Sequence, residues 1–524
     1  MEVHKKIQNA LISVFNKNKI LILAKELIKN NITIFATNKT ENLLKKNNIP
    51  VKNIFNITKK PEILHGKIKT IHPEIFSGIL GNKKDNTNDF KKKSITFFDL
   101  VIVNFYLFDE QQHHQNIECI DIGGPSLARA SAKNYENVTI VTDITDYDNV
   151  IKEINTYGST TISTRIQLAK KAFQYTHQYD YSIMQYFNKK LNINQKKNDI
   201  FPKEIHIKYT KQENLKYGEN PHQKAALYIK TNKKKIGSID SFKQINGNKL
   251  SYNNIYDAHI AYECVNQFEK PTCIIVKHGN PCGASSNQDL AIAYLNAYSS
   301  NPISAFGGII SFNKIINTKI ILIIIKRQFV EIIIGPEITQ KAKNILKLYP
   351  KIKVLICGYP NNNNHKNIEF KTIGNSLLVQ KNYENLNNAN NWNIVSNKKP
   401  SPAEIKYAIF AWKITKFIKS NAILYSDKYY TIGIGSGQTN RLESVKIANK
   451  QYNRNKNIFK LHNRKIIMTS DAFFPFRDSI DTCIHKNISC IVQPGGSIRD
   501  QEVIRAANEY NISMIFTNQR IFTH

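Results

Sequence analysis

One stretch of the sequence predicts the fold most directly: Ile275-Val276-Lys277-His278-Gly279-Asn280-Pro281-Cys282-Gly283. The apolar residues up to Val276 predict a buried strand, and the Gly, Asn and Pro residues after it predict a tight turn. Lys277 and His278 stand where the strand meets the turn. Because an ordered turn can aim an acid and a base at one substrate atom, the stretch indicates the active site of an α/β enzyme.

Outward from this strand, short apolar runs alternate with helical patterns. The first part of the chain has strand-like runs at 11–14, 32–36 and 100–104, and helical patterns at 20–29, 41–47 and 125–134. This alternation predicts a parallel sheet covered by helices on both faces. An amphipathic pattern at 163–189 closes this part, and the polar, lysine-rich residues 192–199 predict a boundary. We therefore expect two domains, residues 1–199 and 200–524.

The second part of the chain alternates again. Strands are predicted at 272–276, 308–312, 354–357, 422–425, 466–469, 490–493 and 514–517, and helices at 258–268, 402–419 and 501–510. The order of these elements indicates an internal duplication. In each half a strand enters a polar motif, a helix follows, and a strand then meets a Gly-Gly pair, Gly307-Gly308 or Gly495-Gly496.

The composition describes a folded, strongly basic chain. Its 524 residues are 41% hydrophobic, and 74 basic against 40 acidic residues give a formal charge of +34. Such a charge raises nucleic acid as a partner. However, the basic residues are 64 lysines and 10 arginines scattered along the chain, whereas nucleic-acid surfaces favour local patches with arginine. We expect no nucleic-acid partner; a basic nucleic-acid-binding protein is the non-enzyme alternative, and it predicts tight, salt-sensitive binding to duplex DNA.

Cysteine usage and hydropathy predict the compartment. The seven cysteines form no C-x-x-C pair, which is typical of reduced thiols in the cytosol. The N-terminus lacks the pattern of a signal peptide. The strongest apolar run, Ile320 to Ile325, is too short to span a bilayer. We therefore expect a cytoplasmic enzyme that does not enter a membrane.

A zinc deaminase is a second enzymatic reading, because a histidine followed by Pro281-Cys282 resembles part of the deaminase signature. The signature also needs a glutamate two residues after the histidine and a second cysteine three residues after the first. Here these positions are Asn280 and Ser285. Three zinc ligands cannot be assembled nearby, so we expect no catalytic metal.

Further motifs lie where ligands commonly bind. Gly433 to Gln438 and Gly495-Gly496-Ser497 offer backbone N–H groups before helices, which suits phosphate or carboxylate groups. In the first part, Asn104-Phe105-Tyr106 ends a predicted strand and Gly123-Gly124-Pro125 opens a helix. Open parallel sheets bind ligands at these ends.

Together with Ser304 to Gly308 and Ser470 to Asp478, these segments resemble, in the same order over nearly the whole chain, the bifunctional AICAR transformylase and IMP cyclohydrolase family of purine biosynthesis. The resemblance implies an N-terminal methylglyoxal-synthase-like domain with the cyclohydrolase. It implies a C-terminal transformylase built from two duplicated, cytidine-deaminase-like α/β subdomains without zinc. It also implies a homodimer.

For the transformylase, the resemblance implies formyl transfer from the folate 10-formyltetrahydrofolate to the amino group of AICAR ribonucleotide. His278 would assist proton removal, Lys277 would stabilise the formyl oxygen or protonate the leaving nitrogen, and Asn421 would orient the formyl group. Further substrate contacts are expected at Lys216, Tyr217, Phe306, Gly307, Phe473, Asp478, Arg520 and Phe522.

For the cyclohydrolase, the resemblance implies that formyl-AICAR ribonucleotide closes to IMP with loss of water. The residues expected to orient and activate this step are Lys69, Tyr106, Asp121 and Lys133. Substrate contacts are expected at Ser13, Lys17, Thr37, Thr40, Thr70, Asn104, Gly123 and Gly124.

The chain departs from the family pattern at two phosphate sites. Lys216 replaces an arginine and loses its fork, and one charged hydrogen bond contributes roughly 1.5–3 kcal/mol. Thr37-Asn38-Lys39-Thr40 replaces a loop with two glycines, which removes easy access to positive φ. We expect an active transformylase and a slower cyclohydrolase. The alternative is a transformylase whose N-terminal half is only a scaffold.

Overall fold

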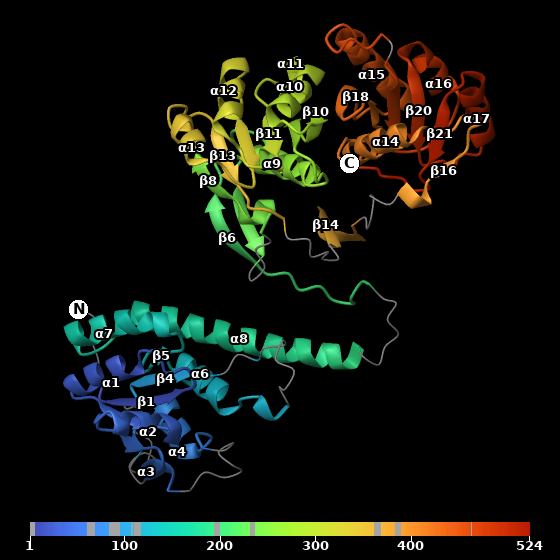
Figure 1. Ribbon diagram of the computed structural model, residues 1–524. Coiled ribbons are helices and arrows are strands. Elements are labelled where there is room, and N and C mark those ends of the chain that lie inside the picture. Colours follow the sequence, from blue (N-terminus) through green and yellow to red (C-terminus); the bar gives the residue numbers. More distant parts are fainter. Residues whose placement is uncertain are drawn as a thin grey trace. The chain divides into compact units, whose positions relative to one another are not determined.

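The chain folds into two compact units, Met1–Glu204 and Ile205–His524 (Figure 1). The computed structural model describes residues 6–59, 69–82, 95–105, 108, 117–192, 200–230, 236–360, 368–382, 389–462 and 464–524. The boundary predicted after residue 199 lies close to this division.

The first unit is built on a five-stranded sheet in the order β3-β2-β1-β4-β5. Every neighbouring pair of strands is parallel, as the alternation of strands and helices predicts. The strands are β1 (Asn9–Val14), β2 (Thr33–Ala36), β3 (Lys52–Asn53), β4 (Leu100–Asn104) and β5 (Thr139–Val141).

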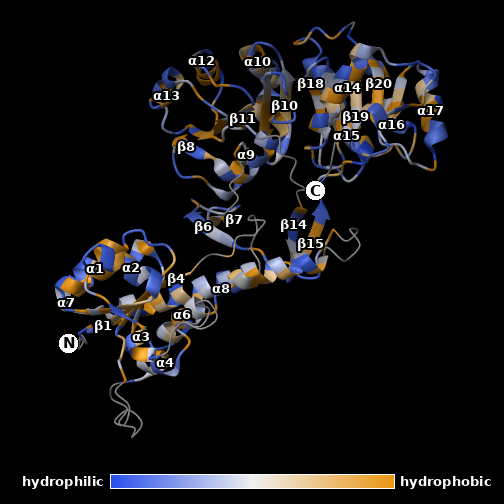
Figure 2. Ribbon diagram, turned by 60° about the horizontal axis from the view of Figure 1, so that its bottom comes forward, coloured by the Kyte–Doolittle hydropathy of each residue, from blue (hydrophilic) through white to orange (hydrophobic). Residues whose placement is uncertain are grey.

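The helices of this unit pack on the sheet around one hydrophobic core. They are α1 (Ile20–Lys29), α2 (Asn38–Lys46), α3 (Phe55–Thr58), α4 (Pro73–Leu80), α6 (Gly123–Lys133), α7 (Tyr147–Tyr157) and α8 (Ile162–Asn192). Along α8, hydrophilic and hydrophobic residues alternate (Figure 2). Its inner face buries Leu168, Ala172 and Tyr179 in the core.

The second unit contains a mixed sheet of twelve strands in the order β16-β21-β20-β19-β17-β18-β10-β9-β11-β12-β13-β8. Its strands are β8 (Lys243–Asn246), β9 (Thr272–Lys277), β10 (Asn280–Ser286), β11 (Ile309–Phe312), β12 (Ile332–Gly335), β13 (Lys353–Ile356), β16 (Asn393–Ile394), β17 (Ile423–Asp427), β18 (Tyr430–Gly435), β19 (Ile466–Ser470), β20 (Ile488–Gln493) and β21 (Ser513–Phe516). Two hairpins form separate sheets: β6 (Tyr209–Asn214) with β7 (Ala226–Lys230), and β14 (Ile368–Ile373) with β15 (Ser376–Lys381).

The helices of the second unit connect these strands. They are α9 (Tyr252–Val265), α10 (Leu290–Ser300), α11 (Pro302–Ala305), α12 (Thr318–Arg327), α13 (Gln340–Leu346), α14 (Pro402–Thr415), α15 (Arg441–Asn455), α16 (Asp478–Cys483) and α17 (Asp500–Glu509). The predicted helix at 402–419 is too long, because the chain leaves α14 after Thr415 in tight turns such as Phe417 N–H to Ile414 O. The apolar run at 320–325 lies in α12, which buries Ile320, Ile321 and Ile324.

The predicted duplication is confirmed. Each half runs through a helix, an antiparallel hairpin, a second helix and three parallel strands, and the two halves meet where β10 pairs with β18. Both first helices begin with a capping box, at Ser251 and Ser401, and these serines are 150 positions apart. The last residues of β9 and β17, Lys277 and Asp427, have the same spacing.

The equivalence predicted for the two Gly-Gly pairs is wrong. Gly307-Gly308 precedes β11, whereas Gly495-Gly496 follows β20, so the pairs occupy different places in the two repeats. A glycine pair indicates that the backbone needs a positive φ or a close approach at that point, and unrelated turns can share this requirement.

Glycines instead serve close packing at the centre of the sheet. A Cβ on Gly283 of β10 would lie 1.9 Å from Ala297 O of α10, and one on Gly435 of β18 would lie 1.9 Å from Ser444 O of α15. Gly433 meets α15 in the same way. Two glycines of the segment 433–438 therefore lie inside β18 and admit a helix, and only Gly437 belongs to the turn after the strand. Anion binding by this segment stays a prediction.

No helix among the described residues combines the length and the apolar character that a membrane crossing requires.

The packing at Gly283 gives a prediction about stability. In an open strand, Gly283→Ala would be neutral or slightly stabilising. Here we expect it to lower the free energy of unfolding of the second unit by about 2 kcal/mol or more, because a methyl group would push against the Ala297 carbonyl. Urea or thermal unfolding measures the change. Ser376→Ala on the exposed β15 is the control, and unchanged stability of Gly283→Ala would refute the close approach.

Candidate active sites

The Lys277-His278 pair lies at the two-residue turn between β9 and β10, as the sequence predicts. His278 has φ 51° and Gly279 has φ 71°. A left-handed conformation is uncommon for a residue with a side chain and costs on the order of 1 kcal/mol or more. The side chain of His278 is exposed at the tip of the turn, and the strand before it is buried up to Val276.

Hydrogen bonds connect this turn to two other segments. Lys277 Nζ donates to the carbonyl of Phe306 at 2.8 Å. Asn280 Oδ1 accepts from the backbone N–H of Lys419 at 2.9 Å, and its Nδ2 donates to His278 O at 3.3 Å. The structure therefore brings the turn together with the loop of Phe306-Gly307 and with the segment that leads to Asn421.

Asn421 is held by the loop after β18. Both its backbone N–H and its Nδ2 donate to Gln438 O, at 3.1 Å and 2.8 Å, and its carbonyl accepts from Ser444 Oγ at 2.8 Å. The side-chain oxygen of Asn421 is the polar group that this arrangement leaves for orienting a ligand.

The last residues of the chain run along the same segment. Thr523 O accepts from Ser420 N at 2.9 Å, and Thr523 N–H donates to Ser420 Oγ at 3.1 Å. The guanidinium of Arg520 lies 4.6 Å from the centre of the Phe522 ring, an attractive cation–π distance. Arg520 and Phe522 are thus placed beside the Asn421 segment, although a hundred residues separate them in sequence.

Arg441 is a residue of this region that sequence reasoning missed. Its guanidinium is nearly buried and donates to Asp471 Oδ1 at 2.8 Å, to Ser470 Oγ at 3.0 Å and to Phe473 O at 3.2 Å. It therefore holds the predicted motif 470–478 in place. The scarcity of arginine in this chain is the signal that could have identified it, because a chain with 64 lysines keeps arginine where a fork is needed.

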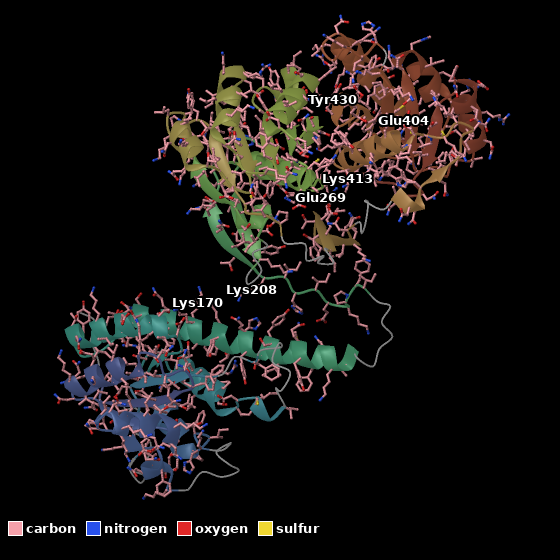
Figure 3. The ribbon with its side chains drawn as sticks, viewed as in Figure 1. Lys170, Lys208, Glu269, Glu404, Lys413 and Tyr430 are labelled. Carbon is pink, nitrogen blue, oxygen red and sulfur yellow. The ribbon has the colours of Figure 1, made fainter. Side chains whose placement is uncertain are left out.

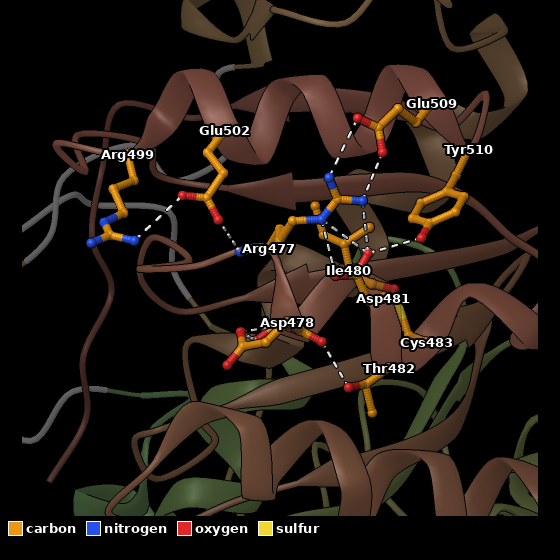
Figure 4. Close-up of polar contacts among 11 residues, drawn as sticks. Arg477, Asp478, Ile480, Asp481, Thr482, Cys483, Arg499, Glu502, Glu509 and Tyr510 are labelled. Carbon is orange, nitrogen blue, oxygen red and sulfur yellow. Dashed lines mark hydrogen bonds and ion pairs between the residues drawn. The ribbon is translucent and has the colours of Figure 1, made fainter.

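Asp478 begins α16, where its carboxylate accepts from the backbone N–H of Ser479 at 2.6 Å. Its neighbour Arg477 joins α16 to α17, because its guanidinium contacts Asp481 at 3.0 Å and Glu509 at 2.7 Å (Figure 4). Tyr510 donates to Asp481 at 2.9 Å. These contacts fix the start of α16 and with it the position of Asp478.

Lys216 and Tyr217 follow β6 and lie against the start of α9. Lys216 N–H donates to Leu250 O at 2.7 Å, and Tyr217 O accepts from Tyr252 N–H at 3.0 Å. The ammonium of Lys216 lies 5.4 Å from the centre of the Tyr217 ring and is exposed. An exposed ammonium on a fixed backbone suits an anionic group.

In the first unit, the candidate residues gather at the carboxyl ends of β1, β2 and β4. Asn104 Oδ1 accepts from the backbone N–H groups of Phe15 and Asn16, each at 2.8 Å. This fixes the loop that carries Ser13 and Lys17, and Lys17 Nζ donates back to Phe15 O at 3.3 Å. Asn104 therefore has a structural role in this loop besides its predicted contact with substrate.

Thr37 and Thr40 form the start of α2. Thr37 is the residue before the helix, and Thr40 is buried in its first turn, with no hydrogen-bond partner for Oγ1 among the described atoms. No residue from Thr37 to Thr40 has a positive φ. The segment is helical from Asn38 and uses no left-handed conformation, which agrees with the loss of easy access to positive φ expected from the absence of both glycines.

A second candidate binding segment is the start of α6, residues 121–124, which we call the Asp121 cradle. Gly124 N–H donates to Asp121 Oδ1 at 3.0 Å, and a Cβ on Gly123 would lie 2.8 Å from the hydroxyl of buried Thr70. The backbone N–H of Asp121 donates to Tyr179 Oη of α8 at 2.7 Å. Burial raises the pKa of Tyr179, which keeps its hydroxyl neutral.

The remaining residues predicted for the first unit are Lys69, Tyr106 and Lys133. Lys69 lies next to Thr70, and Tyr106 lies outside the described residues. Lys133 is the last residue of α6, roughly 15 Å from Gly123 at 1.5 Å per residue. It lines a groove of about 730 Å³ with Arg129 and with Lys170 of α8, which Figure 3 labels. A single chain therefore does not bring Lys133 together with Asp121.

In the part of the chain that the structure describes, no three His, Cys, Asp or Glu side chains are grouped so that they could hold a metal ion. All seven cysteines are free, and only Cys119 is exposed.

Fold and sites define an enzyme with two α/β units, one with ligand loops at the carboxyl ends of a parallel sheet and one with a Lys-His turn suited to group transfer. Comparison with known proteins agrees. The profile of the AICARFT/IMPCHase bienzyme matches residues 131–451, and that of the MGS-like domain matches residues 19–126.

Curated relatives match over the full length. A "Bifunctional purine biosynthesis protein PurH" of Buchnera aphidicola subsp. Schizaphis graminum is 48% identical over 100% of both chains. The protein of the same description from Wigglesworthia glossinidia brevipalpis is 45% identical over 99% of both. The chain belongs to the AICARFT/IMPCHase bienzyme family. It is a formyltransferase and IMP cyclohydrolase that catalyses the last two steps of IMP synthesis, and the predicted fold class and function are confirmed.

The contact between Tyr179 and Asp121 predicts a selective defect. Tyr179→Phe keeps the buried ring but removes the acceptor for the Asp121 N–H, a loss of about 1 kcal/mol that loosens the cradle. We expect kcat/KM for ring closure to fall about fivefold and formyl transfer to be unchanged, which steady-state assays of each half reaction measure. Tyr186→Phe, whose ring packs on Phe108 and Phe187, is the matched control. Equal loss of both activities would contradict the prediction.

Proposed function

We propose that the second unit transfers the formyl group of 10-formyltetrahydrofolate to the amino group of AICAR ribonucleotide at the His278 turn. The observation that carries this proposal is the meeting of Lys277, His278 and the Asn421 segment, each held by backbone hydrogen bonds. Two groups that exchange protons and one amide that orients a carbonyl are what formyl transfer to a weak amine needs.

In this step the amine nitrogen attacks the formyl carbon, and the bond from that carbon to the folate nitrogen breaks. The proton of the amine passes to the imidazole of His278, and the folate nitrogen gains a proton as it leaves. Lys277, fixed by its hydrogen bond to Phe306 O, carries a positive charge beside the formyl oxygen or the leaving nitrogen. A preorganised donor of this kind contributes roughly 3 kcal/mol to transition-state stability.

Binding of the two substrates would use the surrounding residues. Lys216 and Tyr217 would contact the phosphate, Phe306 and Gly307 the nucleotide, and Arg520 and Phe522 the far side of the site. Phe473 and Asp478 would contact the folate, and the buried fork of Arg441 keeps their loop in place.

The first unit would close the ring of formyl-AICAR ribonucleotide to give IMP. The carboxamide nitrogen attacks the formamide carbon, and water leaves. The start of α2 supports phosphate binding, because the backbone N–H groups of Asn38 and Lys39 and the hydroxyl of Thr40 have no partner among the described residues. Lys69, Tyr106 and Asp121 would activate the amide, at the end of the sheet where ligands of open α/β folds bind.

The position of Lys133 supports a homodimer. If Lys133 takes part in ring closure, a second copy of the chain must supply it, since about 15 Å of helix separates it from the Asp121 cradle of its own chain. The groove around it combines apolar residues with three cations, Arg129, Lys133 and Lys170, and would face that second copy. The seven free cysteines support a cytoplasmic location.

His278→Ala tests the assignment of formyl transfer. We expect the rate of transfer from 10-formyltetrahydrofolate to AICAR ribonucleotide to fall by about 100-fold or more, because the proton acceptor is lost. Ring closure of supplied formyl-AICAR ribonucleotide should stay at the wild-type rate, since that site lies in the other unit. Wild-type transfer by the variant would refute the assignment.

Mixed dimers test the role of Lys133. Asp121→Asn and Lys133→Ala chains should each be inactive in ring closure when purified alone. If each site combines Asp121 of one chain with Lys133 of the other, mixing the two variants under conditions of subunit exchange restores activity at the one site that is intact. No recovery after proven exchange would place both residues in the same chain.

A further inference from the structure

Two exposed phenylalanines lie beside the His278 turn, and one of them, Phe329, has no role in the sequence patterns or in the proposed mechanism. The rings of Phe306 and Phe329 are in contact, with 5.9 Å between their centres and 49° between their planes. Their exposed fractions are 58% and 46%, although phenylalanine is among the residues most often buried. The carbonyl of Phe306 accepts from Lys277 Nζ at 2.8 Å, so the pair adjoins the lysine to which the proposed mechanism assigns a role.

Phe329 supports the loop of Phe306 through both its backbone and its ring. Its carbonyl accepts from the backbone N–H of Gly307 at 2.9 Å. Gly307 has φ 70°, a left-handed conformation that glycine adopts without strain, and a Cβ placed there would lie 3.8 Å from the Phe329 ring. The ring therefore packs beside the backbone of the loop as well as against the Phe306 side chain, and both contacts restrict the directions that the Phe306 ring can take.

The second repeat provides an internal comparison for the two phenylalanines. The sheet register aligns β11 with β19 and β12 with β20 through equivalent pairs: Val276 with Ile309 and Ser426 with Ile467, then Ile309 with Ile332 and Ile467 with Cys490. Counting back three positions from the residues of these four strands shows that Phe306 corresponds to Arg464 and Phe329 to Asn487.

The second repeat forms the same junction with polar side chains. The guanidinium of Arg464 lies 3.6 Å from the carboxylate of Asp427, the residue equivalent to the lysine of the first turn. Asn487 Nδ2 donates to His462 O at 3.0 Å, and Asn487 O accepts from Ile466 N–H at 3.0 Å. The fold therefore does not need aromatic rings at this junction. Because the exposed rings occur in the repeat whose turn carries the Lys-His pair, they indicate a ligand that packs on them.

We propose that Phe329 is a positioning residue for formyl transfer, which holds the Phe306 ring as a flat apolar wall against the ring system of a substrate. The proposal rests on the proposed function, which places both substrates at the His278 turn. A flat aromatic ring is the chemistry that such a wall binds, by stacked or edge-on contact. Since AICAR ribonucleotide and 10-formyltetrahydrofolate both carry flat rings, the test distinguishes between them.

The test compares Phe329→Leu with the wild-type enzyme as the full-length chain. Leucine removes the flat ring but keeps an apolar side chain and the backbone carbonyl that holds Gly307. We expect the KM of one substrate of formyl transfer to rise about fivefold, with kcat, ring closure and the thermal midpoint nearly unchanged. A rise for AICAR ribonucleotide places its base on the Phe306 ring, and a rise for 10-formyltetrahydrofolate places the folate there. Phe329→Tyr, which keeps the ring, should retain the wild-type KM.

Two further variants complete the design. Tyr349→Leu removes an exposed aromatic ring just after α13 in the same repeat; it is the matched control and should leave all these measurements unchanged. A double-mutant cycle with Phe306→Leu tests whether Phe329 acts through Phe306. If it does, the KM of the double variant is no higher than that of Phe306→Leu alone.

Wild-type KM values for both substrates in Phe329→Leu would overturn the proposal, as would a fall in kcat alone, equal loss of both activities, or additive effects in the cycle. If Phe329→Leu does not fold, wild-type KM values in Phe306→Leu overturn it. His278→Ala separates the two levels: if that change leaves transfer intact, the proposed function of the turn fails, whereas if only Phe329→Leu is silent, the positioning role alone fails.

Discussion

The pairing of β10 with β18 is the contact on which the second unit depends. Here the two repeats join through one antiparallel register and through Ser286 N–H, which donates to Tyr429 O at 2.8 Å. A buried threonine, Thr431, accepts from Ala284 N–H at 2.9 Å across the same seam. Since buried polar groups need partners, this geometry is closely specified. The seam places the loops of the second repeat beside the turn of the first, so the candidate site is assembled only because the halves are joined.

The two repeats therefore share the same backbone arrangement at their central hairpins, but the turns of these hairpins carry different side chains. Both repeats present a left-handed residue at the tip of a central hairpin, His278 in one and Lys428 in the other. In the first the turn carries the Lys277-His278 pair, and in the second Tyr429 of the turn packs against the ring of Tyr407. The second repeat instead contributes Asn421 and the C-terminal segment, which approach the first turn through Lys419 and Asn280. Function on a duplicated fold therefore resides in a few side chains at equivalent backbone positions.

The departures of the first unit from its family pattern have a structural explanation. The start of α2 is helical from Asn38, so a phosphate there would meet helix N–H groups and not a glycine turn. The loop after β1 is fixed by Asn104, whose side-chain oxygen accepts from the N–H groups of Phe15 and Asn16 and whose carbonyl accepts from Phe15 N–H at 3.1 Å. Such contacts fix the backbone at this edge of the sheet although lysine and asparagine have replaced other residues around it.

Local patterns predicted many of the strands and helices, the parallel sheet of the first unit, the repeat in the second and the Lys277-His278 turn, because periodicity and turn chemistry are local properties. They missed the strands β10, β12 and β18 and the helices α10, α12 and α15. Sequence patterns did not reveal the antiparallel central hairpins or the fork of Arg441. These depend on which strands become neighbours, and a one-dimensional pattern carries no register between residues far apart. Tertiary structure also placed Lys133 in one groove with Lys170 of α8, because the packing of α8 against α6 brings together residues far apart in sequence.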